Sequence, residues 1–167
     1  MSSAMLISYR IANTNEDFET GKLLFEEYAK SLNVDLAFQN FSKELDAINE
    51  QYNEPSGGLL FAFYDGRPIG CAGVRQLDKE TAELKRMYVK DEYRGLKIGA
   101  ELLQRSIDLA RILGYAKLRL DTLANMIKAQ QLYRSFGFYE IPAYRYNPLT
   151  GTIYMEKDLS SADQSIK

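Results

Sequence analysis

The feature that most constrains this 167-residue chain is a strand pattern that runs through a glycine-containing turn directly into a long amphipathic helix. The strand is expected at residues 81–89 and the helix at residues 94–113, where apolar side chains recur every three to four positions. Gly114 follows at the position where helices commonly end. A helix of this kind buries its apolar stripe against a sheet, so the chain is predicted to have an α/β fold.

The turn between this strand and helix has the composition of an anion site. Gly95 and Gly99 allow the backbone to approach a ligand closely, and Arg94 and Lys97 add positive charge. The first amides of a helix lack internal partners, and together with the helix dipole they bind phosphate. The turn therefore predicts a pyrophosphate site, although the glycines could instead serve only tight packing of the helix on the strand. It lacks the Gly-Lys-Ser/Thr ending of a P-loop and the glycine spacing of a dinucleotide fingerprint.

The rest of the chain alternates helical and strand patterns without an internal repeat. Thr14 and Asn125 are expected to cap the first and last helices. The order predicts an α/β fold with a mixed central sheet of about seven strands flanked by helices, and a ligand crevice at a strand-to-helix junction. One domain is expected over residues 1–159, followed by a flexible tail at 160–167. The other strands are expected at 5–11, 59–64, 68–77, 117–121, 138–141 and 152–159, and the other helices at 14–32, 38–52 and 125–136.

Composition excludes several classes of function. The formal net charge is −2, so no basic excess exists to bind nucleic acid. The chain has no histidine and one cysteine, Cys71, which excludes Ser-His-Asp and Cys-His catalysis and argues against a metal site. Cys71 lies in an apolar run and is expected to be a small buried side chain. No signal peptide or membrane-spanning run is evident, so a cytoplasmic protein without membrane contact is expected.

Two segments resemble motifs of the GNAT superfamily of N-acetyltransferases. Residues 88–103, YVKDEYRGLKIGAELL, resemble motif A, whose pattern is Arg/Gln-x-x-Gly-x-Gly/Ala. Residues 128–138, KAQQLYRSFGF, resemble the family's next helix, which ends in Leu-Tyr-x-x-x-Gly-Phe. Both occur in the family's order, with one helix and one strand between them. The resemblance extends over residues 5–159 and is sharpest from 83 to 138.

The chain departs from this pattern at two positions. Lys97 stands where the family usually has glycine, and a side chain there is tolerated if its φ is negative. The family often has an asparagine three residues before the alanine of the second motif, where this chain has Met126, with Asn125 one residue earlier.

The resemblance implies an acetyltransferase that uses acetyl-CoA and transfers the acetyl group to a primary amine of a small molecule or peptide by direct attack. The pyrophosphate would lie on the 94–100 loop and the pantetheine arm along the end of the 81–89 strand. A backbone N–H near Met87 would stabilise the oxyanion. The implied cofactor-binding residues are Met87, Tyr88, Val89, Arg94, Gly95, Leu96, Lys97, Ile98, Gly99, Ala100, Asn125 and Lys128.

Two side chains are implied as catalytic by the same resemblance. Tyr133 matches the Leu-Tyr position and would donate a proton to the leaving thiolate; its alternative is a core aromatic. Glu83 would act as the base, directly or through water. Its alternative is a cross-strand ion pair with Lys85, Arg86 or a neighbour.

The acceptor side is less specific in the sequence. Tyr139, Tyr144, Tyr146 and Asn147 could line it, and the acidic residues between 44 and 54 favour a cationic acceptor. An alternative function is a non-catalytic acyl-CoA-binding sensor or interaction module of the same fold. An acetyltransferase directed at tRNA or the ribosome is disfavoured by the negative net charge. A homodimer is one option, since an exposed last strand could pair between subunits.

Overall fold

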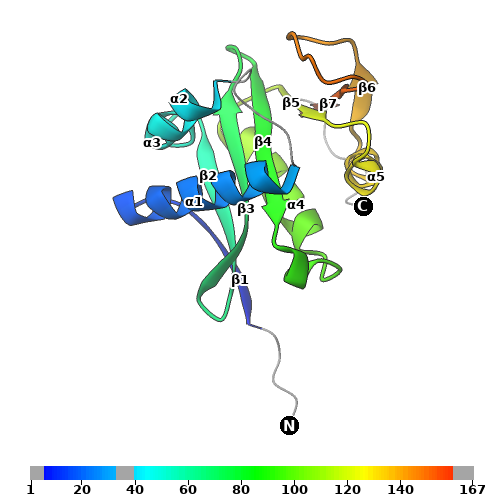
Figure 1. Ribbon diagram of the computed structural model, residues 1–167. Helices are drawn as coiled ribbons and strands as arrows, with labels where there is room; N and C mark the ends of the chain where they lie inside the picture. Colours follow the sequence, from blue (N-terminus) through cyan, green and yellow to red (C-terminus); the bar gives the residue numbers. More distant parts are fainter. Residues whose placement is uncertain (1–5, 33–39, 160–167) are drawn as a thin grey trace, which may run out of the picture.

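The computed structural model describes residues 6–32 and 40–159, which form one seven-stranded sheet covered by helices on both faces (Figure 1). The strand order is β1-β2-β3-β4-β5-β7-β6. β4 and β5 are parallel and every other neighbouring pair is antiparallel, so the predicted mixed α/β sheet is confirmed. The strands are β1 Ile7–Ile11, β2 Gly58–Tyr64, β3 Arg67–Gln76, β4 Thr81–Val89, β5 Lys117–Thr122, β6 Tyr139–Ile141 and β7 Ile153–Asp158.

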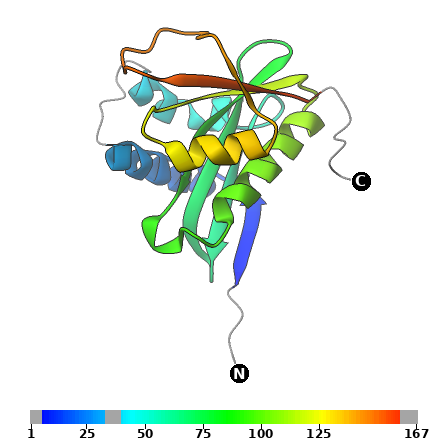
Figure 2. The same ribbon diagram turned by 90° about the vertical axis from the view of Figure 1, so that its right-hand side faces the viewer.

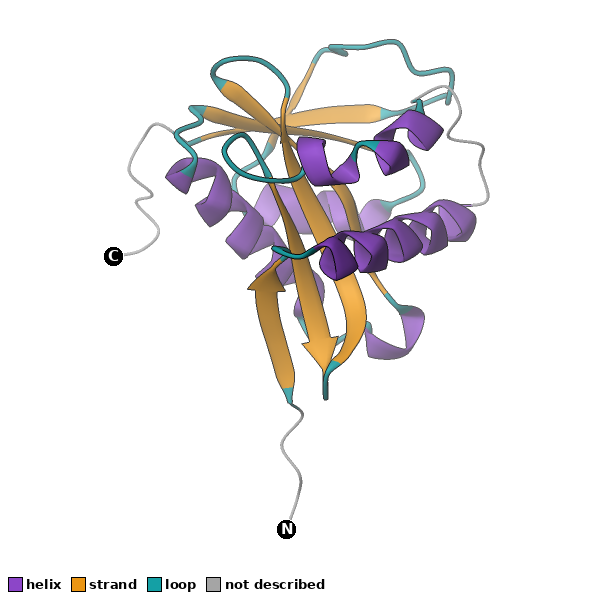
Figure 3. Cartoon of the chain, turned by 90° about the vertical axis from the view of Figure 1, so that its left-hand side faces the viewer, coloured by secondary structure: helices purple, strands orange, loops and turns teal. Residues whose placement is uncertain are grey.

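Helices α1 (Asn15–Leu32), α2 (Phe41–Asp46) and α3 (Ile48–Gln51) lie on one face of the sheet (Figure 3). The single helix expected over 38–52 is therefore two short helices that meet at Ala47, and residues 38 and 39 lie outside the described residues. α4 (Ile98–Ile112) and α5 (Ile127–Ser135) lie on the opposite face (Figure 2). None of the helices in the described residues is both long and apolar enough to cross a bilayer.

The start of α1 is fixed by a capping box. The Asp17 amide donates to Thr14 Oγ1 at 3.1 Å, and the Thr14 amide donates to Asp17 Oδ2 at 3.3 Å. Thr14 is therefore confirmed as the N-cap. The Arg10 guanidinium also binds both oxygens of Asp17 at 2.8 Å, which ties β1 to the first turn of α1.

Each face of the sheet has its own apolar core. Leu84, Leu102 and Leu118 belong to the core between the sheet and α4. Phe25 and Phe61 belong to the core beneath α1 and α3, together with Cys71, which is fully buried as expected. Because both faces are covered, the central strands carry apolar side chains on both sides, as strands of a doubly covered sheet do.

The parallel strands β4 and β5 diverge soon after they start. They pair only from Thr81 with Lys117 to Glu83 with Arg119, although β4 continues to Val89. Beyond Glu83 the edge of β4 that faces β5 is therefore no longer paired by it. The register of β3 and β4 also shifts at this level, and Arg86 has a positive φ of 58°. This bulge makes the side chains of β4 change faces, so that Tyr88 joins the core beneath α1 while Met87 and Val89 contact the core beneath α4.

Three local predictions were wrong. The helix expected from Arg94 begins at Ile98, because the positive φ angles of Gly95 (85°) and Lys97 (63°) interrupt it after a 3-10 turn at Asp91–Tyr93. Asn125 does not cap α5, because that position is taken by Met126, which makes no side-chain cap hydrogen bond. The last strand, β7, lies between β5 and β6 rather than at an edge, so it is not free to pair with a second subunit.

Two further expectations concern the ends of the chain. The predicted tail at 160–167 lies outside the described residues, as does residue 5, where the first predicted strand begins. Nothing therefore tests the expected division into a domain and a tail. The helix end expected at Gly114 is consistent with its φ of 92°. Asp65 and Gly66, which both have a positive φ, form the turn between β2 and β3.

Candidate active site

The loop before α4 has the shape of a phosphate site. Arg94, Gly95, Leu96 and Lys97 are exposed, and Lys97 occupies the N-cap position without a side-chain hydrogen bond to the helix. The first amides of this 15-residue helix therefore receive no cap from that side chain. The loop is held to β4 by a hydrogen bond from Arg94 Nε to the Val89 carbonyl at 3.2 Å.

The two glycines of the loop are not explained by tight packing. A Cβ at Gly95 would meet no atom within 4 Å, and one at Gly99 would meet only Leu132 Cδ2 at 3.9 Å, an ordinary contact. Gly95 is explained by its positive φ of 85°. Gly99 has neither a positive φ nor a crowded Cβ position. Its lack of a side chain therefore leaves the space above the helix N-terminus open. The residues present thus fit a pyrophosphate.

α5 flanks the same helix end. Leu132 of α5 approaches Gly99 of α4, and Lys128 precedes Leu132 by one turn, so the two share a face of α5. Lys128 and Asn125 are exposed, Ile98 is buried and Ala100 is half-buried. Of the predicted cofactor residues, the structure thus brings Lys128 to the side of α5 that faces the loop.

The end of β4 contributes backbone more than side chains. Met87 and Val89 are half-buried against the core on the α4 face. Tyr88 points the other way, where its hydroxyl donates to Glu27 Oε2 of α1 at 2.6 Å and its ring packs edge-on against Tyr28. If these three residues bind the cofactor, as expected, they do so through their main-chain groups, which lie beyond the point where β4 stops pairing with β5.

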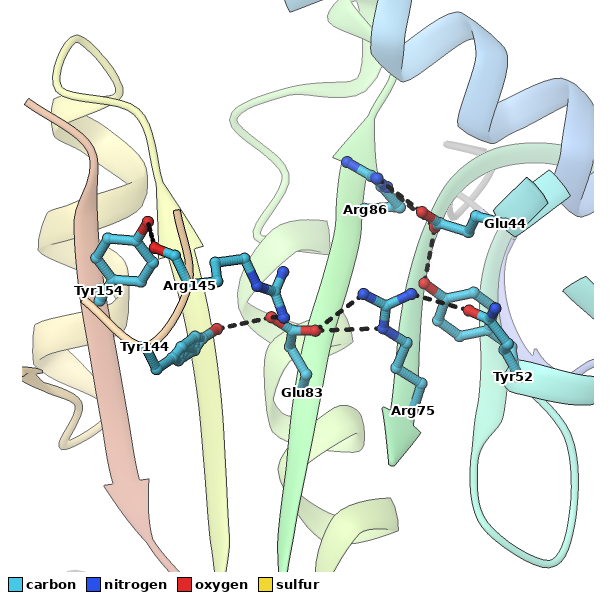
Figure 4. Close-up of polar contacts among 9 residues, drawn as sticks. Glu44, Tyr52, Arg75, Glu83, Arg86, Tyr144, Arg145 and Tyr154 are labelled. Atoms are coloured by element: carbon cyan, nitrogen blue, oxygen red, sulfur yellow. Dashed lines mark hydrogen bonds and ion pairs between the residues drawn. The ribbon is translucent and has the colours of Figure 1, made fainter. Parts of the chain in front are cut away.

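Glu83 is fully buried and forms the centre of a polar network whose other members are partly exposed (Figure 4). Arg75 binds its Oε1 through Nε and Nη2, both at 3.2 Å, and Arg145 Nη2 lies 2.7 Å from its Oε2. The Tyr144 hydroxyl donates to the same Oε2 at 2.6 Å. Burial alone would raise the pKa of Glu83, but the positive charges of Lys85, Arg145 and Arg75 outweigh it and lower the pKa to about 2.

This geometry favours the ion-pair alternative for Glu83. One partner, Arg75, lies directly opposite on β3, and the other, Arg145, comes from the segment before β7. Arg75 and Arg145 thus take the place of Lys85 and Arg86, the two partners that the ion-pair alternative named. A carboxylate whose pKa is about 2 accepts a proton poorly near neutral pH, which makes Glu83 a weak candidate for the base.

A second network neutralises Glu44, one of the acidic residues between 44 and 54 that were expected to favour a cationic acceptor, whereas Asp46, Glu50 and Glu54 are exposed. Glu44 is 2% exposed and binds Arg86 through two hydrogen bonds of 2.7 and 3.1 Å. The Tyr52 hydroxyl adds a third at 2.8 Å. Glu44 thus offers no free negative charge to an acceptor, and it anchors the bulged residue of β4 to α2.

Tyr133 lies on α5 and is 8% exposed, with its ring edge-on to Phe138 at 5.9 Å. Its hydroxyl makes no hydrogen bond to any residue that the structure describes. Burial raises its pKa, and nearby Tyr28 and Asp121 add to the effect, so Tyr133 keeps its proton at neutral pH. The side chain thus combines a core contact with a free hydroxyl.

A small pocket of about 30 Å³ adjoins the point where β4 and β5 diverge. Its lining comes from α1, β4, β5 and the segment before β7, and includes Tyr28, Arg86, Asp121 and Asn147. Sequence reasoning missed Asp121, although its place near the end of a predicted strand that leads towards a helix was a usable signal. Residues 6–32 and 40–159 contain no group of three or more Asp, Glu, Cys or His side chains that could hold a metal ion.

The four predicted acceptor residues separate in the structure. Asn147 lines the pocket, where its Oδ1 accepts a hydrogen bond from the Leu149 amide at 2.8 Å. Tyr144 belongs to the Glu83 network and is not among the residues that line the pocket. Tyr139 and Tyr146 are 47% and 82% exposed, and neither lines the pocket.

Comparison with known proteins places the chain in a family. A sequence model described as the acetyltransferase (GNAT) family matches residues 23–138. An uncharacterized N-acetyltransferase of Schizosaccharomyces pombe is 36% identical over 92% of this chain and 96% of its own length. Mouse N-acetylaspartate synthetase is 32% identical over 77% of this chain, which spans 44% of that protein. A GNAT family acetyltransferase from Elizabethkingia anophelis, solved with acetyl-CoA bound, has a TM-score of 0.65 at 22% identity and covers 92% of this chain and 98% of its own.

The chain belongs to the acetyltransferase (GNAT) family, as its two sequence motifs implied. It is an acyltransferase enzyme of that family. The acceptor is not fixed by this membership.

Proposed function

We propose that the protein transfers the acetyl group of acetyl-CoA to a primary amine of a small molecule or peptide, and that the amine enters through the pocket between α1, β4, β5 and the segment before β7. The observation that carries this proposal is the divergence of β4 and β5 after Glu83, between the phosphate loop and this pocket. Acetyl-CoA supplies an activated thioester. The protein supplies binding groups, orientation and proton transfer.

The cofactor-binding residues are proposed in two groups. The amides at the start of α4, with Arg94, Lys97 and Lys128, would hold the pyrophosphate by charge and hydrogen bonds. The main chain of Met87 and Val89 would pair with the pantetheine arm, because the edge of β4 that faces β5 has lost its strand partner there. A main-chain N–H at this edge is also suited to stabilising the oxyanion.

The proton donor is proposed to be Tyr133. Its hydroxyl is free of hydrogen bonds within the described residues, and its raised pKa keeps it protonated. Glu83 is proposed as a positioning residue: through Arg145 and Tyr144 it fixes the segment that closes the pocket over the sheet. This role follows from its buried ion pairs, which leave it little capacity to accept a proton.

The proposal is tested by measuring free thiol released from acetyl-CoA across a panel of amines, with mass spectrometry of the products. The panel includes L-aspartate, because one relative is named for N-acetylaspartate, along with other amino acids, diamines and short peptides. At least one amine is expected to accelerate thiol release and gain 42 Da per acetyl group, roughly the mass of that group less one hydrogen. Tight binding of acetyl-CoA with no acceleration by any amine would instead support the sensor or interaction module.

A further inference from the structure

One carboxylate in the pocket has no hydrogen-bond partner. Asp121 lies on β5, where Leu118 and Leu120 are buried in the core on the α4 face, so the alternation of the strand directs Asp121 to the opposite face, which carries the pocket. Its Oδ2 is buried and receives no hydrogen bond from the described residues. A buried acceptor without a partner is costly, and such groups persist where function requires them.

Other carboxylates on this face are paired. Glu83 binds two guanidinium groups and a tyrosine hydroxyl, and Glu44 binds Arg86 and Tyr52. The other buried side-chain atom without a hydrogen bond in the described residues, Arg119 Nε, lies 3.5 Å from an oxygen of Glu156, so its charge is compensated. Asp121 differs because no ion pair or hydrogen bond is formed by its carboxylate within residues 6–32 and 40–159.

Asp121 lies among tyrosines and charged side chains from several elements. Burial is the main cause that raises the pKa of Tyr28 and Tyr133, and the charge of Asp121 contributes to both, so this carboxylate lies near both rings. It also acts on Lys85 of β4 and on Arg145 of the segment before β7. Asp121 thus lines the same pocket as Tyr28 of α1 and Arg86 of β4, and its charge also acts on Tyr133 of α5.

We infer that Asp121 binds the ammonium group of the acceptor in this pocket and accepts one of its protons. The inference rests on the proposed function. An ammonium group supplies the donors that the buried Oδ2 lacks, and it must lose a proton before its nitrogen can attack. One contact between Asp121 and the ammonium group would therefore satisfy the buried Oδ2 and remove the proton.

The proton balance of the transfer is as follows. Asp121 takes one proton from the ammonium, and the neutral nitrogen forms a bond to the thioester carbonyl carbon. The carbon–sulfur bond breaks and the sulfur receives the proton of Tyr133. The nitrogen loses its second proton through solvent, which restores the Tyr133 hydroxyl, and Asp121 releases its own proton to solvent. One proton is thus set free for each acetyl group transferred.

The test compares Asp121→Asn with wild type and with Asp108→Asn, which changes an exposed aspartate on α4. The acceptor is the best primary amine from the panel, and acetyl-CoA affinity is measured separately. Asp121→Asn is expected to lower kcat/KM for this amine by about 100-fold or more, a typical contribution of proton transfer. Acetyl-CoA affinity and the activity of Asp108→Asn should stay close to wild type.

Two further readouts separate this role from a structural one. The unfolding midpoint of Asp121→Asn should be unchanged or higher, because the variant removes a buried carboxylate that has no hydrogen bond. An amine that is mostly neutral at the assay pH, 2,2,2-trifluoroethylamine, should lose less activity than the strongly basic amine. Wild-type activity in Asp121→Asn would overturn the inference, as would an equal loss for both amines with a lowered midpoint. No turnover by wild type with any amine would overturn the proposed function itself.

Discussion

Lys97 adopts a backbone conformation that usually belongs to glycine. Its φ of 63° is the left-handed region, whereas a side chain at this position was expected to require a negative φ. The loop therefore keeps the course that a glycine would permit and carries an exposed charge beside the proposed phosphate site. The strain of such a residue is on the order of 1–2 kcal/mol.

Replacing Lys97 should separate its strain from its charge. Lys97→Gly relieves the left-handed conformation and Lys97→Ala retains it, while both remove the charge. Lys97→Gly is expected to be more stable than Lys97→Ala by about 1 kcal/mol in urea unfolding. Both variants should bind acetyl-CoA several-fold more weakly at low salt, by about the same factor. Equal stability of the two variants would contradict the conformational argument.

Tyr133 is expected to matter for turnover more than for binding. Tyr133→Phe keeps the edge-on contact with Phe138 and removes only the hydroxyl, which has no hydrogen bond to lose in the described residues. Turnover should fall by about 10- to 100-fold, while acetyl-CoA affinity changes little. Tyr139→Phe, at an exposed position, is the matched control. Unchanged turnover in Tyr133→Phe would remove this residue from the mechanism.

At the level of elements, the proposed site lies where β4 and β5 diverge, and buried ion pairs connect the elements around it. Glu44 fixes the bulged residue Arg86 from the α2 side, and Glu83 fixes the segment before β7 through Arg145. The two carboxylates lie on the same face of the sheet and connect elements far apart in the sequence (Figure 4). Loss of either network should therefore affect the shape of the pocket as well as stability.

The Glu83 network predicts a specific dependence of stability on pH. The pKa of Glu83 falls from 4.5 to about 2 on folding, so its contribution is complete above pH 4.5 and is lost as the pH falls from there towards 2. A shift of this size corresponds to about 3 kcal/mol at neutral pH. Glu83→Gln should be less stable than wild type by that order in urea unfolding at pH 7, and the difference should shrink as the pH is lowered to 3. A difference that is constant from pH 7 to pH 3 would contradict the ion-pair account.

At the level of the whole molecule, two apolar cores support one mixed sheet, and the site lies where that sheet opens. α4 and α5 cover one face and carry the phosphate loop and Tyr133, while α1 covers the other and borders the pocket (Figures 2 and 3). The proposed reaction would therefore connect the two faces through the gap in strand pairing between β4 and β5.

Local periodicity was sufficient to predict much of this architecture. β4 has the predicted bounds, 81–89, and Thr14 caps α1 as expected, because both depend on neighbouring residues. The predicted start of α4 was wrong because the positive φ of Lys97 cannot be recognised from the pattern of residue types. The partners of Glu83 and the isolation of Asp121 were missed because they depend on pairings such as Tyr144 with Glu83, 61 residues apart.

The proposed binding mode can be tested with a crystal structure of the protein with CoA bound. We expect the pyrophosphate on the amides at the start of α4, with Arg94, Lys97 and Lys128 beside it. We also expect the pantetheine arm along β4 between Met87 and Val89, and the sulfur within hydrogen-bond distance of the Tyr133 hydroxyl. A pyrophosphate bound away from the 94–100 loop, or a sulfur that does not reach the gap between β4 and β5, would contradict this binding mode.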